Sequence, residues 1–307
     1  MIAKFFSKAK PIHFVIIVLA LLIVFVSTVI LSSGYEVSLS GFLKQMLLFV
    51  VCFFSLFIFD FLIGKNNLTK KNSYHLLLFC LLIIQIPQAF LEYQVLIANL
   101  FILFALRRII SIRSKKYLKK KLFDAAFWIT LATLLSFWAS LFYILIFAAL
   151  FIYKISDVKN WIVPFLGILT VFIIGFSLAL VLNQPIMPIG YYVPEISFDF
   201  STLNSNQIII AATVYFTYFL WSLLFYLKNL KSKSKNYKAS YILILIAAFI
   251  ALAIIILKPN KSGADFLFLI APLSIIVANY IELIKEKWFR EVLIWILIIA
   301  PFVSLML

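Results

Sequence analysis

The sequence predicts an all-α membrane protein whose helices cross the bilayer repeatedly. Hydrophobic residues make up 65% of the 307 residues, and charged residues make up only 12%. The mean hydropathy is +1.15. Soluble domains carry roughly a quarter charged residues, and apolar runs near the ~20 residues that a membrane-spanning helix needs recur along this chain. We therefore expect residues 1–307 to form a single integral membrane domain.

The predicted elements begin with a basic, aromatic segment, residues 1–11, which is typical of a short helix in the membrane interface. The apolar run that follows is longer than the hydrophobic region of a signal peptide and lacks an A-x-A-like cleavage site. We interpret it as a retained first span. Hydropathy predicts nine spans: 12–32, 42–63, 75–87, 94–112, 161–183, 207–227, 239–257, 265–281 and 290–306.

A further apolar region, residues 123–153, is too long for one untilted span and is interrupted by Ser136 and Ser140. Basic residues flank it on both sides, which favours two short helices that return to the starting side. One long tilted helix is the alternative, and it would reverse every later loop. The total is therefore nine to eleven membrane segments.

Lysine and arginine predict the orientation of the spans. With the two-helix hairpin, 24 of the 27 basic residues lie on the side of the N-terminus, and Lys44, Lys258 and Lys261 lie on the other. Basic residues in short loops stay in the cytoplasm. We expect a cytoplasmic N-terminus and a C-terminus on the far side.

The densest basic segment, the connector 107–121, is first of all a topology determinant. It lies at the cytoplasmic face, where its cations also attract anionic lipid or an acidic partner protein. It lacks the interleaved aromatic residues of a nucleic-acid platform, so we expect no nucleic-acid partner. Its cations are Arg107, Arg108, Arg113, Lys115, Lys116, Lys119, Lys120 and Lys121.

The longest connector on the far side, residues 183–207, contains three prolines, several aromatic residues and no lysine or arginine. The prolines argue against a continuous helix. Its side chains suit the headgroup layer, the docking of a partner protein, or a substrate lid. The candidate docking residues are Tyr191, Tyr192, Glu195, Phe198 and Asp199.

Ionisable residues inside spans mark functional sites, because a charge in the bilayer is costly. Asp60 is the most deeply embedded, and we expect Lys65 or a neighbouring basic group to neutralise it. A proton relay would need a second group at the same depth, and hydropathy identifies none. Asp124 is expected to cap the helix that follows the lysine run. With two histidines and two cysteines, we expect no metal site and no cofactor.

Two far-side turns contain the residue types of an enzyme. Lys258 and Lys261 suit the phosphate of a lipid-linked substrate. Glu36 or Asp265 suits a general base for a sugar hydroxyl. All four residues would have to converge on one cavity.

Two resemblances add to this interpretation. The closing spans, with a basic far-side turn, Pro272 and a basic inner turn, resemble the C-superfamily glycosyltransferases, which use polyprenyl-phosphate sugars. Those enzymes have a long first outer loop with catalytic acids, whereas the loop here is short and holds one acid, Glu36. The whole chain resembles an uncharacterised family of bacterial inner-membrane proteins, through its basic start and the segments ALRRI, LFDAAFW and KPNKSGADF. That resemblance implies a multi-pass protein of the bacterial inner (cytoplasmic) membrane with its C-terminus in the periplasm, and it implies no activity.

Three functions follow as expectations. The first is a non-catalytic subunit or scaffold of an envelope complex of the secretion or assembly type, which binds other membrane or periplasmic proteins through apolar aromatic helices and the far-side loop. The sequence has no paired carboxylates, nucleophile motif or glycine-rich phosphate loop to support catalysis. The second is a polyprenyl-phosphate-dependent glycosyltransferase or ligase, and the third is a small-solute transporter.

Overall fold

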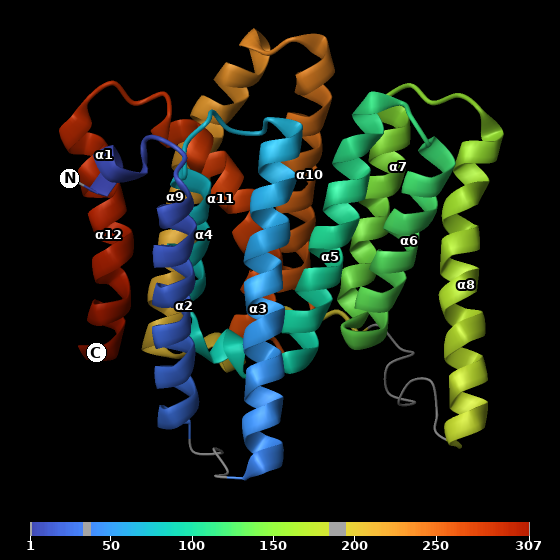
Figure 1. Ribbon diagram of the computed structural model, residues 1–307, viewed down its shortest axis with the longest axis horizontal. Helices are drawn as coiled ribbons and strands as arrows, with labels where there is room; N and C mark the ends of the chain where they lie inside the picture. The colour runs from blue at the N-terminus through green and yellow to red at the C-terminus, as the bar shows by residue number, and fades with distance from the viewer. Residues whose placement is uncertain (1, 33–37, 184–194, 307) are drawn as a thin grey trace.

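The computed structural model describes residues 2–32, 38–183 and 195–306, and this part of the chain contains helices and no strand. After the short helix α1 (Ile2–Phe6), eleven helices run back and forth between the two ends of one bundle (Figure 1). They are α2 (Pro11–Leu31), α3 (Leu39–Asn66), α4 (Tyr74–Ile84), α5 (Tyr93–Ser111), α6 (Leu118–Leu135), α7 (Tyr143–Ile152), α8 (Val158–Leu182), α9 (Asn206–Ser232), α10 (Lys235–Leu257), α11 (Leu267–Ile281) and α12 (Lys287–Met306).

The length and composition of these helices are those of a multi-pass membrane protein. Seven helical segments in the described part are long and apolar enough to cross a bilayer. The helices α4 and α7 are shorter, and each adjoins a 3-10 helix, η1 (Pro87–Phe90) after α4 and η3 (Phe137–Phe142) before α7. The all-α, polytopic fold class is confirmed.

The two ends of the bundle differ in charge. The order of the helices places 24 of the 27 basic residues at the end that carries the N-terminus, and the C-terminus lies at the other end (Figure 1). We call these the basic end and the opposite end. Only Lys44, Lys258 and Lys261 lie toward the opposite end.

Residues 123–153 form two helices rather than one, because Ser136 breaks the run. Ser136 is extended, with φ −143° and ψ 104°, and ends α6. The 3-10 helix η3 then turns the chain, and α7 returns to the basic end (Figure 1). A hydrogen bond of 2.7 Å between the hydroxyls of Thr130 and Tyr143 joins the two arms. The returning hairpin therefore keeps Lys154 and Lys159 with the other cations.

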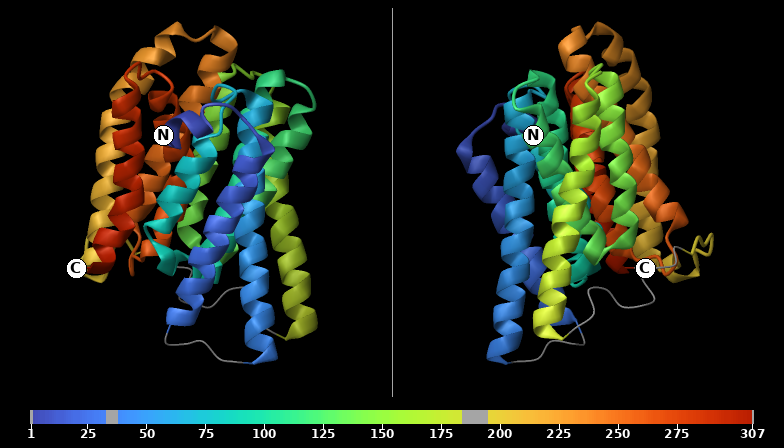
Figure 2. Two further views of the ribbon diagram at one scale, coloured as in Figure 1. Left: turned by 60° about the vertical axis from the view of Figure 1, so that its left-hand side comes forward. Right: turned by 90° about the vertical axis from the view of Figure 1, so that its right-hand side faces the viewer.

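The helices differ greatly in burial. The segment Gly263–Ile281, which includes α11, is buried along its whole apolar stretch, whereas only 11% of the stretch in α8 is buried. The helix α8 lies at the edge of the bundle and packs mainly on α6 (Figures 1 and 2). A close crossing at Gly167 holds it there, because a Cβ atom at Gly167 would lie 2.7 Å from the carbonyl oxygen of Phe123.

We predict that replacing Gly167 with leucine forces α8 away from α6. Overpacking of this kind costs about 1–3 kcal/mol. The midpoint of thermal unfolding in detergent should fall. Gly64→Leu is the matched control, because a Cβ atom at Gly64 meets nothing within 4 Å and the gain in helix propensity is the same. Equal midpoints for the two variants would contradict the close crossing.

Candidate functional site

An ion cluster lies at the opposite end, in the turn between α10 and α11. The ammonium nitrogen of Lys258 lies 2.6 Å from Oδ1 of Asp265, whose side chain is only 1% exposed. Oδ2 of Asp265 accepts a hydrogen bond from the backbone N–H of Ser262, and the Ser262 hydroxyl donates to Oε2 of Glu92, both at 2.9 Å. The cluster joins the start of α5, where Glu92 lies, to the turn before α11. It comprises Glu92, Lys258, Ser262 and Asp265.

Lys261 anchors the segment before α9 to the same turn. Its ammonium group donates to the carbonyl oxygens of Ser197 at 2.6 Å and of Lys258 at 2.9 Å. It also lies 4.6 Å from the centroid of the Phe200 ring, a cation–π distance. The residue is 3% exposed, so its ammonium group interacts with protein atoms rather than with solvent.

The carboxyl groups at this end differ in their surroundings. Burial, together with the neighbouring Asp265 carboxylate, raises the pKa of the Glu92 carboxyl above its usual value, although the Ser262 hydroxyl opposes the shift. Asp199 is exposed, and hydrogen bonds from the backbone N–H and the hydroxyl of Ser201 lower its pKa. Asp199 is therefore ionised at neutral pH. In contrast, burial disfavours the charged form of Glu92.

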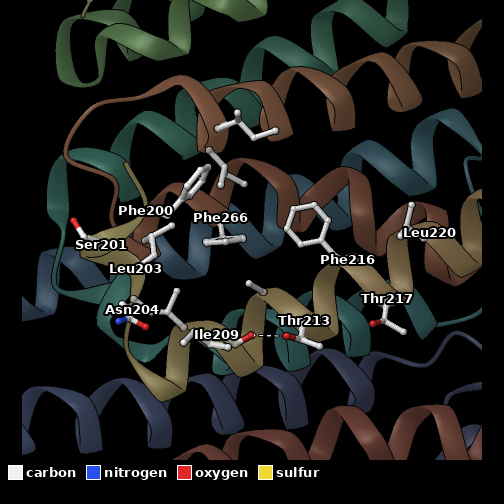
Figure 3. Close-up of a pocket in the computed structure, with 14 residues that line it drawn as sticks. Phe200, Ser201, Leu203, Asn204, Ile209, Thr213, Phe216, Thr217, Leu220 and Phe266 are labelled. Atoms are coloured by element: carbon white, nitrogen blue, oxygen red, sulfur yellow. Dashed lines mark hydrogen bonds between the residues drawn. The ribbon is translucent and has the colours of Figure 1, made fainter. Parts of the chain in front are cut away.

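An apolar pocket of about 840 Å³ lies beside the ion cluster, along α9 and the end of α10 (Figure 3). Phe200, Leu203, Ile208, Phe216 and Phe266 are among its lining residues. Phe200 also contacts Lys261, and Phe266 follows Asp265 in the chain. The pocket suits an apolar chain of a lipid, because its lining contains no charged side chain.

The structure brings together three of the four residues that the enzyme interpretation requires. Lys258 and Asp265 form a buried pair, and Lys261 lies next to them. Glu36 lies outside the described residues, as do Tyr191 and Tyr192. The polar atoms of this group bind one another rather than facing the pocket. A phosphate would have to displace these contacts, and Asp265 is not accessible as a general base.

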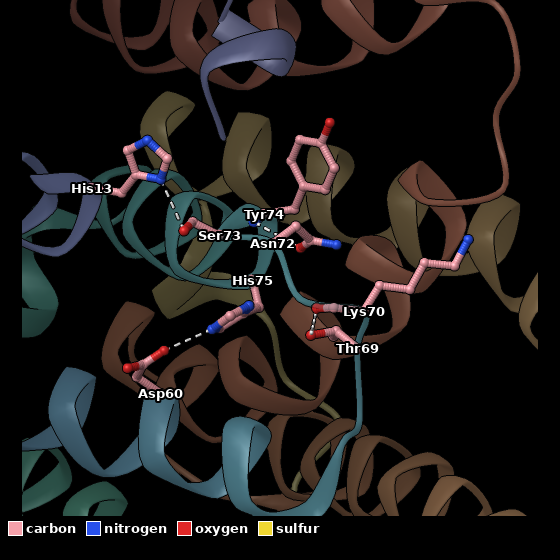
Figure 4. Close-up of polar contacts among 8 residues, drawn as sticks. All are labelled: His13, Asp60, Thr69, Lys70, Asn72, Ser73, Tyr74 and His75. Atoms are coloured by element: carbon pink, nitrogen blue, oxygen red, sulfur yellow. Dashed lines mark hydrogen bonds and ion pairs between the residues drawn. The ribbon is translucent and has the colours of Figure 1, made fainter. Parts of the chain in front are cut away.

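The basic end contains a second polar group, and one expectation for it is wrong. Nε2 of His75 lies 2.9 Å from Oδ1 of Asp60 (Figure 4), so of the two expected kinds of partner, Lys65 or a neighbouring basic group, Asp60 has the second. Asp124 lies in the second turn of α6 and pairs with Arg108 at 2.8 Å, so it does not cap the helix. Hydropathy did not identify His75 as the partner of Asp60, because His75 lies on the next helix. The tight turn between α3 and α4, which brings the two helices side by side, was the available signal for this contact.

The connector cations fall into two groups. Arg113 donates to the carbonyl oxygen of Asn66, and Lys121 donates to the carbonyl of Ser111. Together with the Arg108–Asp124 pair, these contacts fix the connector to the bundle. The remaining lysines are exposed: Lys115, Lys116, Lys119 and Lys120.

The second histidine also lies at the basic end. Nδ1 of His13 and the hydroxyl of Ser73 are 2.9 Å apart (Figure 4). Within the part of the chain that the structure describes, no group of three or more His, Cys, Asp or Glu side chains could hold a metal ion. The histidine contacts join α2, α3 and the start of α4.

Comparison with known proteins places the chain in a family. The model of a family of unknown function, DUF6427, matches residues 1–305. The chain belongs to this family. No curated protein and no solved structure matches the chain. Membership agrees with the resemblance to an uncharacterised family.

We predict that Lys258→Met destabilises the protein strongly, because it leaves the Asp265 carboxylate buried without its partner. Breaking a buried ion pair costs roughly 3–5 kcal/mol. The midpoint of thermal unfolding should fall, and adding Asp265→Asn should recover part of the loss. Lys44→Met, at an exposed lysine of the same end, is the control and should change the midpoint little. If the Lys258 and Lys44 variants melt together, the cluster does not stabilise the turn.

Proposed function

We propose that this protein is a non-catalytic subunit of an envelope complex in the bacterial inner membrane. Its basic end faces the cytoplasm, and a docking surface at the opposite end binds a partner protein in the periplasm. We define the docking surface by Glu195, Ile196, Phe198, Asp199 and Phe200. A complex of the secretion or assembly type fits a subunit of this kind.

The observation that carries the proposal is an anchored backbone with exposed apolar side chains. Ile196, Phe198 and Phe200 are 60%, 67% and 47% exposed. The backbone beneath them is fixed, because Ser197 donates to the carbonyl of Leu257 and accepts from Lys261. A fixed surface loses little conformational entropy on binding. Aromatic side chains of this kind supply much of the binding energy of protein interfaces.

The charge of the surface indicates the chemistry of the partner. Glu195 and Asp199 are exposed beside the apolar side chains, and the lowered pKa of Asp199 keeps it ionised. The nearest cation, Lys261, is buried. The matching partner surface is therefore apolar with basic residues around it. The helix α8 offers a second, membrane-embedded face for another span, since most of its surface is exposed.

The orientation is supported by the distribution of cations. Lysine and arginine remain on the cytoplasmic side of short loops, and 24 of the 27 lie at one end of this bundle. The exposed connector lysines at that end would also attract anionic lipid.

We predict that the double variant Ile196→Ala, Phe198→Ala loses a stoichiometric partner. The native protein is purified in gentle detergent, and co-purifying proteins are quantified by mass spectrometry. The loss should be at least about tenfold, because two interface anchors contribute more than ~1.4 kcal/mol together. The partner should carry basic residues on a periplasmic surface. The matched control is Ile23→Ala, Phe54→Ala, which removes two exposed side chains of the same types from α2 and α3.

Two results would contradict the proposal. One is a partner that is retained equally by the docking variant and the control variant. The other is a native preparation with no stoichiometric protein at all. Replacing Glu195 and Asp199 with lysine separates protein docking from simple insertion in the headgroup layer. Docking to a basic partner should be lost in this variant, whereas insertion in the headgroup layer should remain.

A polyprenyl-phosphate-dependent glycosyltransferase or ligase is the second candidate. One observation favours it: the apolar pocket adjoins the turn that holds Lys258 and Lys261. A polyprenyl lipid that co-purifies with the protein and is lost in the pocket variant Phe216→Trp would support this candidate. The small-solute transporter is third. The observation that bears on it is the contact of 2.9 Å between His75 and Asp60 near the basic end.

A further inference from the structure

A pair of cations without an acidic partner lies on the surface between α3 and α5, at the basic end. The guanidinium carbon of Arg107 is 4.5 Å from the centroid of the Phe61 ring, and the ammonium nitrogen of Lys65 is 5.3 Å from the same centroid. Phe61 and Lys65 are exposed in the last turns of α3, and Arg107 lies one turn before the end of α5. A single aromatic ring, from Phe61, is thus in cation–π contact with two cations.

The carboxylates nearby are already used. Asp124 pairs with Arg108, and Asp60 pairs with His75. Within residues 2–32, 38–183 and 195–306, neither Arg107 nor Lys65 has a carboxylate oxygen within 4.0 Å. The surface is therefore positive after internal pairing.

Further cations strengthen the positive charge. Arg108 repels Arg107 more strongly than the Asp124 carboxylate attracts it, and both Lys65 and Arg108 repel Lys121. Like charges held close together raise the energy of the site unless an anion binds between them. The arrangement of four cations from three helices is thus suited to an anion.

The guanidinium group of Arg107 indicates which anion. A guanidinium carries five N–H donors in one plane, and the guanidinium of Arg107 donates no hydrogen bond within the described part of the chain. The guanidinium carbon lies over the Phe61 ring, and the N–H groups of the guanidinium remain available to a ligand. An edge-on guanidinium matches two oxygens of a phosphate, and a neighbouring lysine adds a point charge.

We propose that Arg107 and Lys65 bind the phosphate of an anionic phospholipid in the leaflet at the basic end. The exposed Phe61 ring lies on the helix surface beside the two cations and contacts the apolar part of the same lipid below its headgroup. A free phosphate would meet the two cations equally well, but it would gain nothing from Phe61. This site is independent of the docking surface at the opposite end.

The test uses the full-length protein, native mass spectrometry and titration with phosphatidylglycerol or phosphatidylcholine. The wild-type protein should bind phosphatidylglycerol in preference to phosphatidylcholine. The double variant Lys65→Gln, Arg107→Gln should reduce that preference on the order of tenfold, since each basic residue near the surface contributes appreciably to anionic lipid binding. The control Lys119→Gln, Lys120→Gln removes the same charge from exposed connector lysines, which attract anionic lipid only through their general positive field, and should reduce the preference clearly less than the double variant.

Two further measurements keep the outcome decisive. Arg107→Lys keeps the charge and loses the planar group, so an intermediate preference is expected, and its thermal unfolding shows that the protein is folded. Soluble glycerol phosphate at millimolar concentration should not displace the lipid. An equal loss in the connector control, or displacement by glycerol phosphate, would overturn the site as a lipid site.

Discussion

A lysine or arginine at the centre of a bilayer costs about 2.5–3.5 kcal/mol even when it is inserted within a helix, and this cost governs the arrangement of the chain. The basic residues occur in clusters near the ends of helices, and the helices between the clusters contain almost none. At the basic end, each cluster after the first therefore lies where one helix that crosses the bundle ends and the next begins. The same cost explains why the few embedded ionisable groups are paired, as Asp60 is with His75.

Pairing of charges also separates the structural residues from those that face outward. At the opposite end, Lys258 and Asp265 neutralise each other in a buried turn, and Lys261 fixes the neighbouring segment. These contacts give the turn a rigid frame in which Asp265 is not accessible as a base. At the basic end, Arg107 and Lys65 remain unpaired on the surface. The proposed docking surface and the proposed lipid site are two places in the described part of the chain where charged and aromatic side chains are exposed together.

The fold class follows from composition and periodicity. Most predicted spans begin and end within three residues of the ends of the observed helices. The hairpin at 123–153 was predictable because basic residues flank the run and Ser136 interrupts it. The sites were less predictable, since they depend on which helices pack together. His75 lies on a different helix from Asp60, so no local pattern pairs them. The sequence places Lys258 and Lys261 correctly in one turn. It does not show how far the two side chains are buried, and because of this burial their ammonium groups bind protein atoms.

The orientation is the claim on which the assignment of every surface depends, and cysteine labelling tests it directly. Ser234→Cys and Asn204→Cys are introduced separately into a Cys52→Ala, Cys80→Ala background, and a membrane-impermeant maleimide is added to spheroplasts. The two positions are exposed and are separated by the helix α9. Asn204→Cys should be labelled at once, and Ser234→Cys should be labelled only after the membrane is permeabilised. Labelling of both positions from the same side would contradict this orientation.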